Sequence, residues 1–361
     1  MTLRKLGIQV LFIMGWEGKM KITYLLWGIG HFGGVKMVFE YADRLIARGH
    51  DVSIVTHFGD YPDWYPLKAK LIKLPPYSND FPKSDVIMAT YWPTAYEVDQ
   101  LKADKKIYYV QGKEESFYTD SERIETVKNT FRLSLKPITI SSWLAEYLRN
   151  GFGLDPFVIP NGIDTSIFKF QNVEKLERRK KTLNLVYVTT GYGRIKGVQD
   201  ALAAFCMVKK QRKMFGLINN RKKNLKITFV TTEKTPPIGA YGCIDQFVSN
   251  PSQEKLIEIY NQGDIFVHAS IIEGFALPPL EAMACGNAVI ATDSMGVREY
   301  CVPGHNCLLL PPREPVELSK AISQLIENDE LRTKLACNGI ETVGRHDWDK
   351  SLDKLEKVFQ G

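Results

Sequence analysis

Short apolar runs alternate along the chain with amphipathic stretches, and this alternation predicts buried strands joined by helices. Residues 21–27 form an apolar, β-rich run, and four glycines follow within 28–34. Residues 35–48 then place apolar side chains three and four positions apart, which is the spacing of one helix face. Gly49 ends that segment, at a position where helices favour glycine. We therefore predict a strand, a glycine turn and a helix at the start of an α/β domain.

The same rhythm of strand and helix continues and later restarts. Further strands are predicted at 51–56, 85–89, 106–110, 137–140 and 157–159. A polar, charge-dense stretch at 168–183 interrupts the rhythm, and we interpret it as a linker. The second series of predicted strands and helices comprises 184–189, 197–210, 225–231, 253–262, 265–268, 278–285 and 288–292. Strands that alternate with helices indicate parallel sheets covered on both faces, so we predict two doubly wound, Rossmann-like domains that face a central cleft.

These patterns divide the chain into four parts. Residues 1–19 have a basic start and an apolar stretch but no small-residue cleavage site. We interpret them as a leader or a mis-called start, with a peripheral anchor as the remaining alternative. Residues 20–170 and 171–345 are the two predicted Rossmann-like domains, and residues 346–361 are a predicted terminal helix.

The composition is that of an ordinary globular protein. Hydrophobic residues make up 44% of the 361 positions and charged residues 24%, which argues against disorder over most of the chain. The net charge of +6 is too weak to indicate a nucleic-acid partner, but it fits a phosphate-bearing ligand or an anionic membrane surface. The six cysteines include no CxxC pair and do not resemble a disulfide framework. We therefore expect a reducing, cytoplasmic compartment, with pairing of some cysteines in a thermophilic cytosol left open.

The strongest chemical signal is the segment EGFALPPLEAMACG, which begins at Glu273. Its two prolines suit the first turn of a helix, whose free N–H groups and positive dipole end favour a phosphate. Glu281 lies one turn inside that helix, and Gly274 permits close approach of the backbone to a ligand. Two carboxylates on either side of an anion site suit the ribose, diphosphate and hexose of a nucleotide sugar. A surface loop with a capping glutamate is the alternative.

This segment resembles the E-x7-E signature of retaining glycosyltransferases of family 4, which have the GT-B fold. The family's usual form is close to EGFGLPPLEAMACG-x-PV; here Ala276 replaces a glycine, and Asn287-Ala288 replaces the x-Pro pair. Further similarity is found in Gly33-Gly34 with a helix ending in ARGHDV, VIPNGID at 158–164, Lys196-Gly197, and GVREYCVPGHNCLLL at 296–310. The resemblance implies that residues 20–170 bind the acceptor, that 171–345 bind the donor, and that 346–361 cross back to the first domain.

The resemblance also assigns roles on the donor side. It implies that Glu281 binds the donor ribose and that Glu273 binds the donor sugar. The remaining donor-binding residues that it implies are Gly274, Phe275, Ala276, Leu277, Gly33, Gly34 and Glu299.

Two cations follow the first strand of the second series, in the sequence GYGRIKG. Lys196 and Arg194 are predicted to stabilise the charge that develops on a leaving diphosphate, with Glu273 as the third member of the catalytic set. Lys196 matches the family position. The family's arginine lies five residues before the lysine, where this chain has Gly191, so Arg194 is a displaced candidate. Solvated loop cations are the alternative.

On the acceptor side, the histidine that many retaining GT-B enzymes direct at the donor sugar is missing. Gln111 stands in the segment where it is expected, and this segment resembles a family 4 subgroup with VQ-x-x-E in its place. Gln111 can hydrogen-bond a sugar hydroxyl but cannot act as a base. Glu114 and Glu115 either contact the acceptor or are surface acids, and His31 is the histidine that we place in the cleft.

These observations predict a retaining glycosyltransferase that moves a hexosyl group from a nucleotide sugar, such as a UDP-, GDP- or dTDP-hexose, to a hydroxyl acceptor. The acceptor is a saccharide or a lipid-linked molecule, and peripheral association with a membrane is left open. No set of His, Cys and carboxylate residues has metal-ligand spacing, so we expect no metal and no cofactor.

Three alternatives remain. The missing histidine suggests a non-catalytic nucleotide-sugar-binding protein. A GT-B epimerase acting on a nucleotide sugar is the second. The third is an NAD-dependent dehydrogenase, because GIGHFGG also matches GxGxxG. That motif lacks its usual acid at the end of the following strand, since the nearest one is Asp60.

Overall fold

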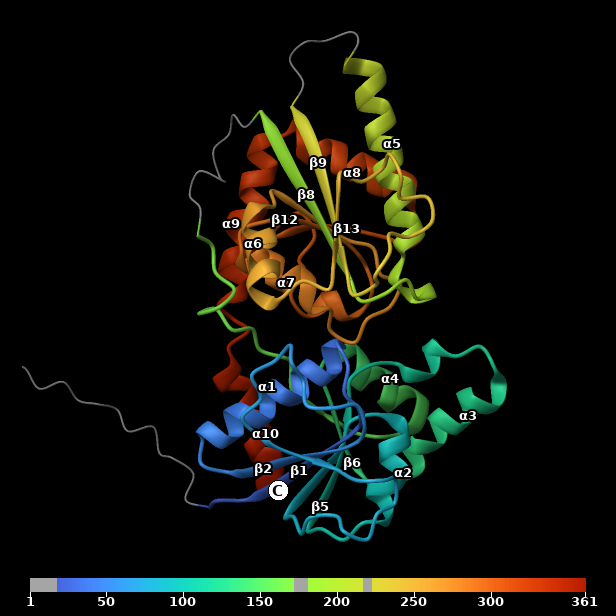
Figure 1. The fold of residues 1–361 in the computed structure, drawn as a ribbon, viewed down its shortest axis with the longest axis vertical. Coiled ribbons are helices and arrows are strands. Elements are labelled where there is room, and N and C mark those ends of the chain that lie inside the picture. The colour runs from blue at the N-terminus through green and yellow to red at the C-terminus, as the bar shows by residue number, and fades with distance from the viewer. Residues whose placement is uncertain (1–17, 172–180, 217–222) are drawn as a thin grey trace, which may run out of the picture.

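The structure is a computed structural model that describes residues 18–171, 181–216 and 223–361. Two α/β halves are stacked along the long axis of the molecule, each around its own parallel sheet (Figure 1). The predicted fold class is confirmed by this arrangement. Most of the predicted leader, residues 1–17, lies outside the described residues, as does 172–180 of the predicted linker.

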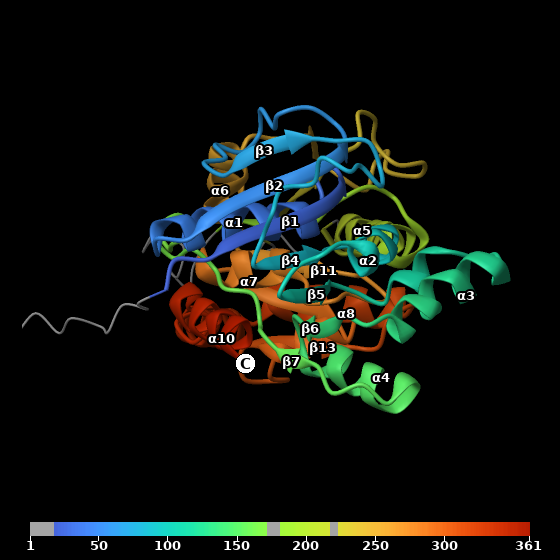
Figure 2. The ribbon, with the colours of Figure 1, turned by 90° about the horizontal axis from the view of Figure 1, so that it is seen from below.

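The N-terminal half contains a seven-stranded parallel sheet in the order β3-β2-β1-β4-β5-β6-β7, which Figure 2 shows from below. Its strands are β1 (Lys21–Gly28), β2 (Asp51–Phe58), β3 (Lys70–Lys73), β4 (Val86–Ala89), β5 (Lys105–Val110), β6 (Lys136–Thr139) and β7 (Phe157–Val158). Strand β1 pairs with β2 on one side and with β4 on the other. The strand order therefore reverses between β1 and β4, where a ligand crevice is expected beyond the carboxyl ends.

Helices cover both faces of this sheet. They are α1 (Gly33–Ala47), α2 (Trp92–Gln100), α3 (Ser121–Asn129) and α4 (Ser142–Phe152), with the short turns η1 (Glu114–Phe117) and η2 (Thr130–Arg132). Successive strand residues point to opposite faces. Tyr24 accordingly packs in the core that α1 shares, whereas Leu25 packs in the core that α2 and α4 share.

The C-terminal half contains a six-stranded parallel sheet in the order β10-β9-β8-β11-β12-β13. Its strands are β8 (Thr182–Thr189), β9 (Asn224–Thr231), β10 (Gln246–Ser249), β11 (Ile265–His268), β12 (Ala288–Thr292) and β13 (Cys307–Leu310). Its helices and turns are η4 (Arg194–Lys196), α5 (Val198–Gly216), α6 (Gln253–Gln262), α7 (Leu277–Ala284), η5 (Gly296–Glu299), α8 (Pro315–Glu327) and α9 (Asp329–Val343). The strand order reverses between β8 and β11, so a second crevice is expected there.

The terminal helix α10 (Trp348–Gln360) packs on the N-terminal half, against α1. Arg48, which ends α1, donates hydrogen bonds at 2.7 to 2.9 Å to the carboxylates of Asp349, Asp353 and Glu356. The Trp348 ring lies 5.0 Å from that of Tyr41 in α1. These contacts join the end of the chain to its first helix.

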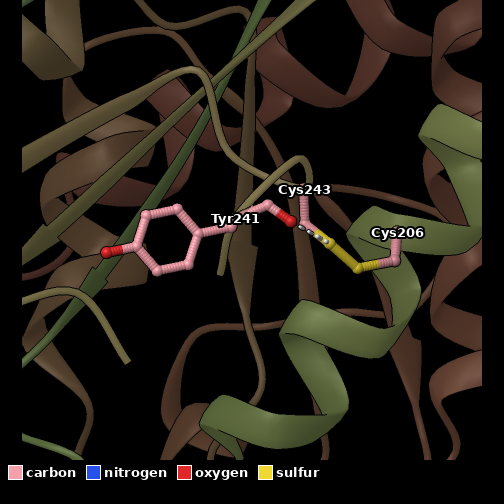
Figure 3. Close-up of a disulfide and its surroundings, with 3 residues drawn as sticks. All are labelled: Cys206, Tyr241 and Cys243. Atoms are coloured by element: carbon pink, nitrogen blue, oxygen red, sulfur yellow. Dashed lines mark hydrogen bonds between the residues drawn. A yellow bond between two sulfur atoms is a disulfide. The ribbon is translucent and has the colours of Figure 1, made fainter. Parts of the chain in front are cut away.

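Cys206 of α5 and Cys243, in the loop before β10, form a disulfide with their Cα atoms 4.7 Å apart (Figure 3). The sequence analysis left pairing of some cysteines open, and this pair is one such case. The two cysteines are 37 positions apart in sequence, so the pair exists only because the loop that carries Tyr241 packs against α5.

Among the described residues, no helix is both long and apolar enough to cross a bilayer.

Candidate functional site

The loops at the carboxyl ends of the two sheets meet between the halves. Gln111 follows β5, and its backbone oxygen abuts Gly274, which lies in the loop between β11 and α7. A Cβ atom on Gly274 would overlap that oxygen, so only glycine permits the approach. The indole N–H of Trp143, in α4, donates a hydrogen bond to the carbonyl of Gly274 at 3.0 Å. The halves are therefore in contact around this loop.

Glu273 is an ionised carboxylate held by the C-terminal half. Its Oε1 accepts hydrogen bonds from Lys196 Nζ at 2.7 Å and from Ser270 Oγ at 2.8 Å. Burial raises the pKa of Glu273, but the Lys196 ammonium, His268 and the two hydrogen bonds outweigh it and hold the pKa below its usual value. The side chain is therefore an acceptor-only group that suits sugar hydroxyls.

Lys196 reaches Glu273 because the turn after β8 lies against the loop after β11. Gly197 has a left-handed φ of 62°, and a Cβ there would overlap the carbonyl oxygen of Ala269. Tyr187 donates a hydrogen bond to the Lys196 carbonyl at 3.1 Å, which fixes the backbone of the turn. Arg194 lies two residues earlier with an exposed side chain. The structure thus brings Lys196 to Glu273 but leaves Arg194 on the rim.

Glu281 is buried in α7, and both of its carboxylate oxygens are engaged. Tyr260 of α6 donates a hydrogen bond to Oε2 at 3.0 Å. Lys36 of α1 reaches across from the N-terminal half, with its Nζ 3.2 Å from Oε1. Burial and the nearby Glu281 carboxylate raise the pKa of Tyr260, which stays a hydrogen-bond donor at neutral pH.

Helix α7 begins between the two acids, as the double proline predicts. Pro278 and Pro279 lie in its first turn. Ala276 precedes the helix with a φ of 65°, in the left-handed region that favours glycine. This is the position at which the family pattern has glycine. The start of a helix leaves N–H groups without partners inside the helix and carries the positive end of the helix dipole, both of which favour an anion.

The glycine turn after β1 lies beside Gln111. A Cβ on Gly34 would approach the Gln111 amide to 3.1 Å, whereas a Cβ on Gly33 would meet no atom within 4 Å. The Gln111 amide nitrogen lies 3.4 Å from the Thr90 carbonyl, and its Oε1 is buried without a hydrogen-bond partner among the described residues. His31 packs on Trp64, with ring centres 4.6 Å apart, and burial lowers its pKa.

Glu114 and Glu115 are buried in the N-terminal half, so the alternative that they are surface acids is wrong. Glu114 Oε2 accepts hydrogen bonds from the Trp92 backbone at 2.7 Å and from Tyr108 at 3.3 Å. Burial raises the pKa of Glu114 to about 8, against the effect of these hydrogen bonds. Glu115 accepts a hydrogen bond from the Tyr147 hydroxyl. A role for either acid toward the acceptor stays a prediction.

Glu299 also bridges the halves. From the turn η5, its Oε1 accepts a hydrogen bond at 2.5 Å from the backbone N–H of Ser142, in the first turn of α4. A carboxylate at this helix end satisfies a free N–H and interacts favourably with the helix dipole. The structure therefore gives Glu299 an interdomain contact, and a contact with the donor stays a prediction.

The sequence patterns missed four side chains that hold the two acids: Lys36, Tyr260, Ser270 and His268. Ser270 and His268 lie within five residues of Glu273, so their proximity to it is visible in the sequence. Burial lowers the pKa of His268 to about 4, which leaves a neutral ring beside the acid at pH 7. Within the described parts of the chain, no group of three or more His, Cys, Asp or Glu residues could hold a metal ion.

Comparison with known proteins agrees with this geometry. Residues 169–342 match the family described as Glycosyl transferases group 1, and this range contains Glu273, Glu281 and Lys196. The two parallel sheets with facing carboxyl ends are those of glycosyltransferases of GT-B type, so the fold of the chain is GT-B.

Particular relatives show the extent of the likeness. Sucrose-phosphate synthase from Thermosynechococcus elongatus superposes with a TM-score of 0.76 at 18% identity, over 95% of this chain and 98% of that one. HepE from Anabaena, in complex with UDP-glucose, has a TM-score of 0.74 at 15% identity, over 95% and 100% of the two chains. In sequence, the uncharacterised glycosyltransferase MJ1178 of Methanocaldococcus jannaschii is 38% identical over 72 residues, which is 20% of each protein. The chain thus matches about a fifth of that curated relative's length.

Proposed function

We propose that this protein is a glycosyltransferase that uses a nucleotide diphosphate sugar as donor. The observation that carries the proposal is the pair of acids, Glu273 and Glu281, on either side of the start of α7, with Lys196 bound to the first of them. The family match over residues 169–342 supports the same conclusion. So does the name of the relative MJ1178.

In the proposed donor complex, Glu281 accepts hydrogen bonds from the ribose hydroxyls and Glu273 accepts them from the sugar. The diphosphate lies at the start of α7, where free N–H groups and the helix dipole favour its charge. Lys196 lies on the same side and stabilises the negative charge that develops as the sugar–phosphate bond breaks. Arg194 joins it if its exposed side chain turns inward when the donor binds.

The finer parts of the proposal are a hexosyl donor, retention of the anomeric configuration and independence from a metal ion. In a front-face reaction the leaving phosphate oxygen takes the acceptor proton, so no protein base is required. The amide of Gln111 is compatible with this mechanism, because it can orient a hydroxyl but cannot remove its proton. Membership of the VQ-x-x-E subgroup, to which the sequence from Val110 to Glu114 is similar, is a further part of this proposal.

The acceptor is proposed to dock on the N-terminal half, where aromatic side chains are exposed near the carboxyl ends of β1 and β2. Phe32, Phe58 and Tyr61 are exposed by 65%, 51% and 60%. The Trp27 ring lies 5.2 Å from that of Phe58. Flat, amphipathic faces of this kind suit sugar rings and the interface of a membrane, so they support a saccharide or lipid-linked acceptor and peripheral association with a bilayer.

A non-catalytic nucleotide-sugar-binding protein is the second candidate, because Gln111 replaces the histidine of related enzymes. The NAD-dependent dehydrogenase receives no comparable support. Asp60, the acid nearest the end of β2, is exposed and lies 3.1 Å from Lys73. It is therefore directed to solvent rather than to a ribose beside the glycine turn.

The test is a thermal-shift panel of UDP-, GDP- and dTDP-sugars with NAD, followed by a nucleotide-release assay. We expect one nucleotide sugar to raise the melting temperature and to release its nucleoside diphosphate when a hydroxyl acceptor is added. Stabilisation by NAD alone would overturn the proposal. Binding without release in the presence of acceptors would favour the non-catalytic candidate, and release without any acceptor would favour an epimerase.

A further inference from the structure

Lys36 and Glu281 form an ion pair that joins the two halves of the molecule. Lys36 lies one turn into α1 of the N-terminal half, and Glu281 lies in α7 of the C-terminal half. Their Nζ and Oε1 atoms are 3.2 Å apart, with side chains exposed by 21% and 8%. The ammonium also lies 5.1 Å from the centre of the Phe168 ring, which is buried. The ion pair and this cation–ring contact thus hold the Lys36 side chain between the two halves.

This pair occupies an acceptor that the proposed donor needs. A ribose diol donates two hydrogen bonds, and in the proposed complex one hydroxyl competes with Lys36 for Oε1 of Glu281. Tyr260 takes one position on Oε2 at 3.0 Å, and a carboxylate oxygen can accept a second donor. Lys36 takes Oε1 with a charged donor, which forms a stronger hydrogen bond than a hydroxyl does. Glu281, which we propose as the ribose acceptor, is therefore already paired with an ammonium group from the N-terminal half.

The contact also has the burial that an effective ion pair requires. Fully exposed pairs contribute little because water and salt screen them. Lys36 is mostly shielded and Glu281 is buried, so their attraction is less screened. Elsewhere between the halves, Gly274 abuts Gln111 and accepts a hydrogen bond from Trp143. The ion pair is therefore one of several contacts that join the two halves.

We propose that the Lys36–Glu281 pair is an interdomain latch that holds the two halves together, and that the ribose of an incoming nucleotide displaces Lys36 from Glu281. This inference rests on the proposed function, because it takes Glu281 as the ribose acceptor. A ligand that binds only the unlatched state competes with the latch, so the latch lowers the apparent affinity for nucleotide.

The closing role is tested without nucleotide, by small-angle X-ray scattering of the full chain. We expect Lys36→Met to increase the radius of gyration, because the population of molecules with separated halves rises when this contact is lost. Lys36→Arg should keep the wild-type value. Lys73→Met is the matched control, since it removes the same charge from an exposed lysine 3.1 Å from Asp60. Scattering of Lys36→Met that is identical to wild type overturns the latch.

The competing role is tested by titration calorimetry with UDP, GDP and dTDP. For the nucleoside diphosphate that wild type binds, Lys36→Met should bind about three- to tenfold more tightly, because a competitor of Glu281 is gone. Equal or weaker binding by Lys36→Met overturns the displacement. Failure of all three nucleotides to bind either protein overturns the proposed function and the displacement with it, whereas the scattering result decides the closing role by itself.

Discussion

Lys196 donates a 2.7 Å hydrogen bond to Glu273 and so joins the loop after β8 to the loop after β11. These two loops leave neighbouring strands at the point where the order of the C-terminal sheet reverses. The pair lowers the pKa of Glu273 despite its burial, so one contact supplies a fixed acceptor and a fixed cation in the same site. The proposed chemistry depends on both.

Lys196→Ala should therefore slow nucleotide release by about a hundredfold or more, which is typical when one fixed electrostatic contact to a transition state is removed. Arg194→Ala is the comparison, and we expect a smaller loss because Arg194 is exposed. Steady-state release of nucleoside diphosphate at saturating donor measures both. A Lys196→Ala rate within threefold of wild type would contradict the assignment.

Glu114 predicts a dependence of stability on pH. Burial raises its pKa to about 8, whereas the unfolded carboxyl titrates near 4.5. Between these values the folded state binds the extra proton, so the free energy of unfolding falls as the pH rises from 5 to 8. Glu114→Gln removes this loss while keeping an acceptor for the Trp92 N–H. We expect its melting temperature to exceed that of wild type at pH 8 and to match it at pH 5; a constant difference across this range would contradict the raised pKa.

Ala276 predicts a stabilising substitution. Its φ of 65° is costly for a residue with a Cβ atom, whereas glycine adopts it readily. Ala276→Gly should raise the free energy of unfolding by about 1 kcal/mol, measured by denaturant titration. Ala282→Gly is the control, because this residue lies inside α7 and the same change there should destabilise. A loss of stability in Ala276→Gly would show that the left-handed backbone is not strained.

The Cys206–Cys243 disulfide closes a long loop and should stabilise the C-terminal half. For a sequence separation of 37 residues, the loss of chain entropy in the unfolded state corresponds to about 4 kcal/mol. Cys206→Ser should lower the midpoint of denaturation, and a reducing agent should do the same to wild type but not to the variant. Cys337→Ser, at an exposed cysteine, should have little effect. Equal midpoints for wild type and Cys206→Ser would contradict a formed disulfide.

The sequence patterns predicted the central strands and the edge strand β7, and they missed the edge strands β3, β10 and β13. Strand β11 coincides with its predicted range because all four of its residues are buried and all but His268 are apolar. Strands β3 and β10 lie at edges of their sheets and are only partly buried, so their sequences carry no continuous apolar run. A pattern of apolar residues in the sequence reflects burial of the strand, and an edge strand is less buried than a central one.

Among the residues of the candidate site, the sequence singled out those that lie close together in the chain and not those that only the fold brings together. The sequence singled out Glu273 and Glu281 because a short segment carries both acids, together with the helix start between them. Lys36 was not found, since 245 residues separate it from Glu281 and only the packing of the two halves brings them together. The sequence left Glu114 open between an acceptor contact and a surface acid, and only tertiary packing shows that it is buried.

The most direct test of the account is nucleotide binding by Glu281→Ala in the Lys36→Met background, where the latch no longer contributes. Titration calorimetry with the nucleoside diphosphate that wild type binds should show affinity reduced at least tenfold relative to Lys36→Met alone, because two hydroxyls lose a charged acceptor. Circular dichroism should confirm that both variants are folded. Equal affinity in the two variants would contradict the central claim that Glu281 binds the ribose of a nucleotide donor.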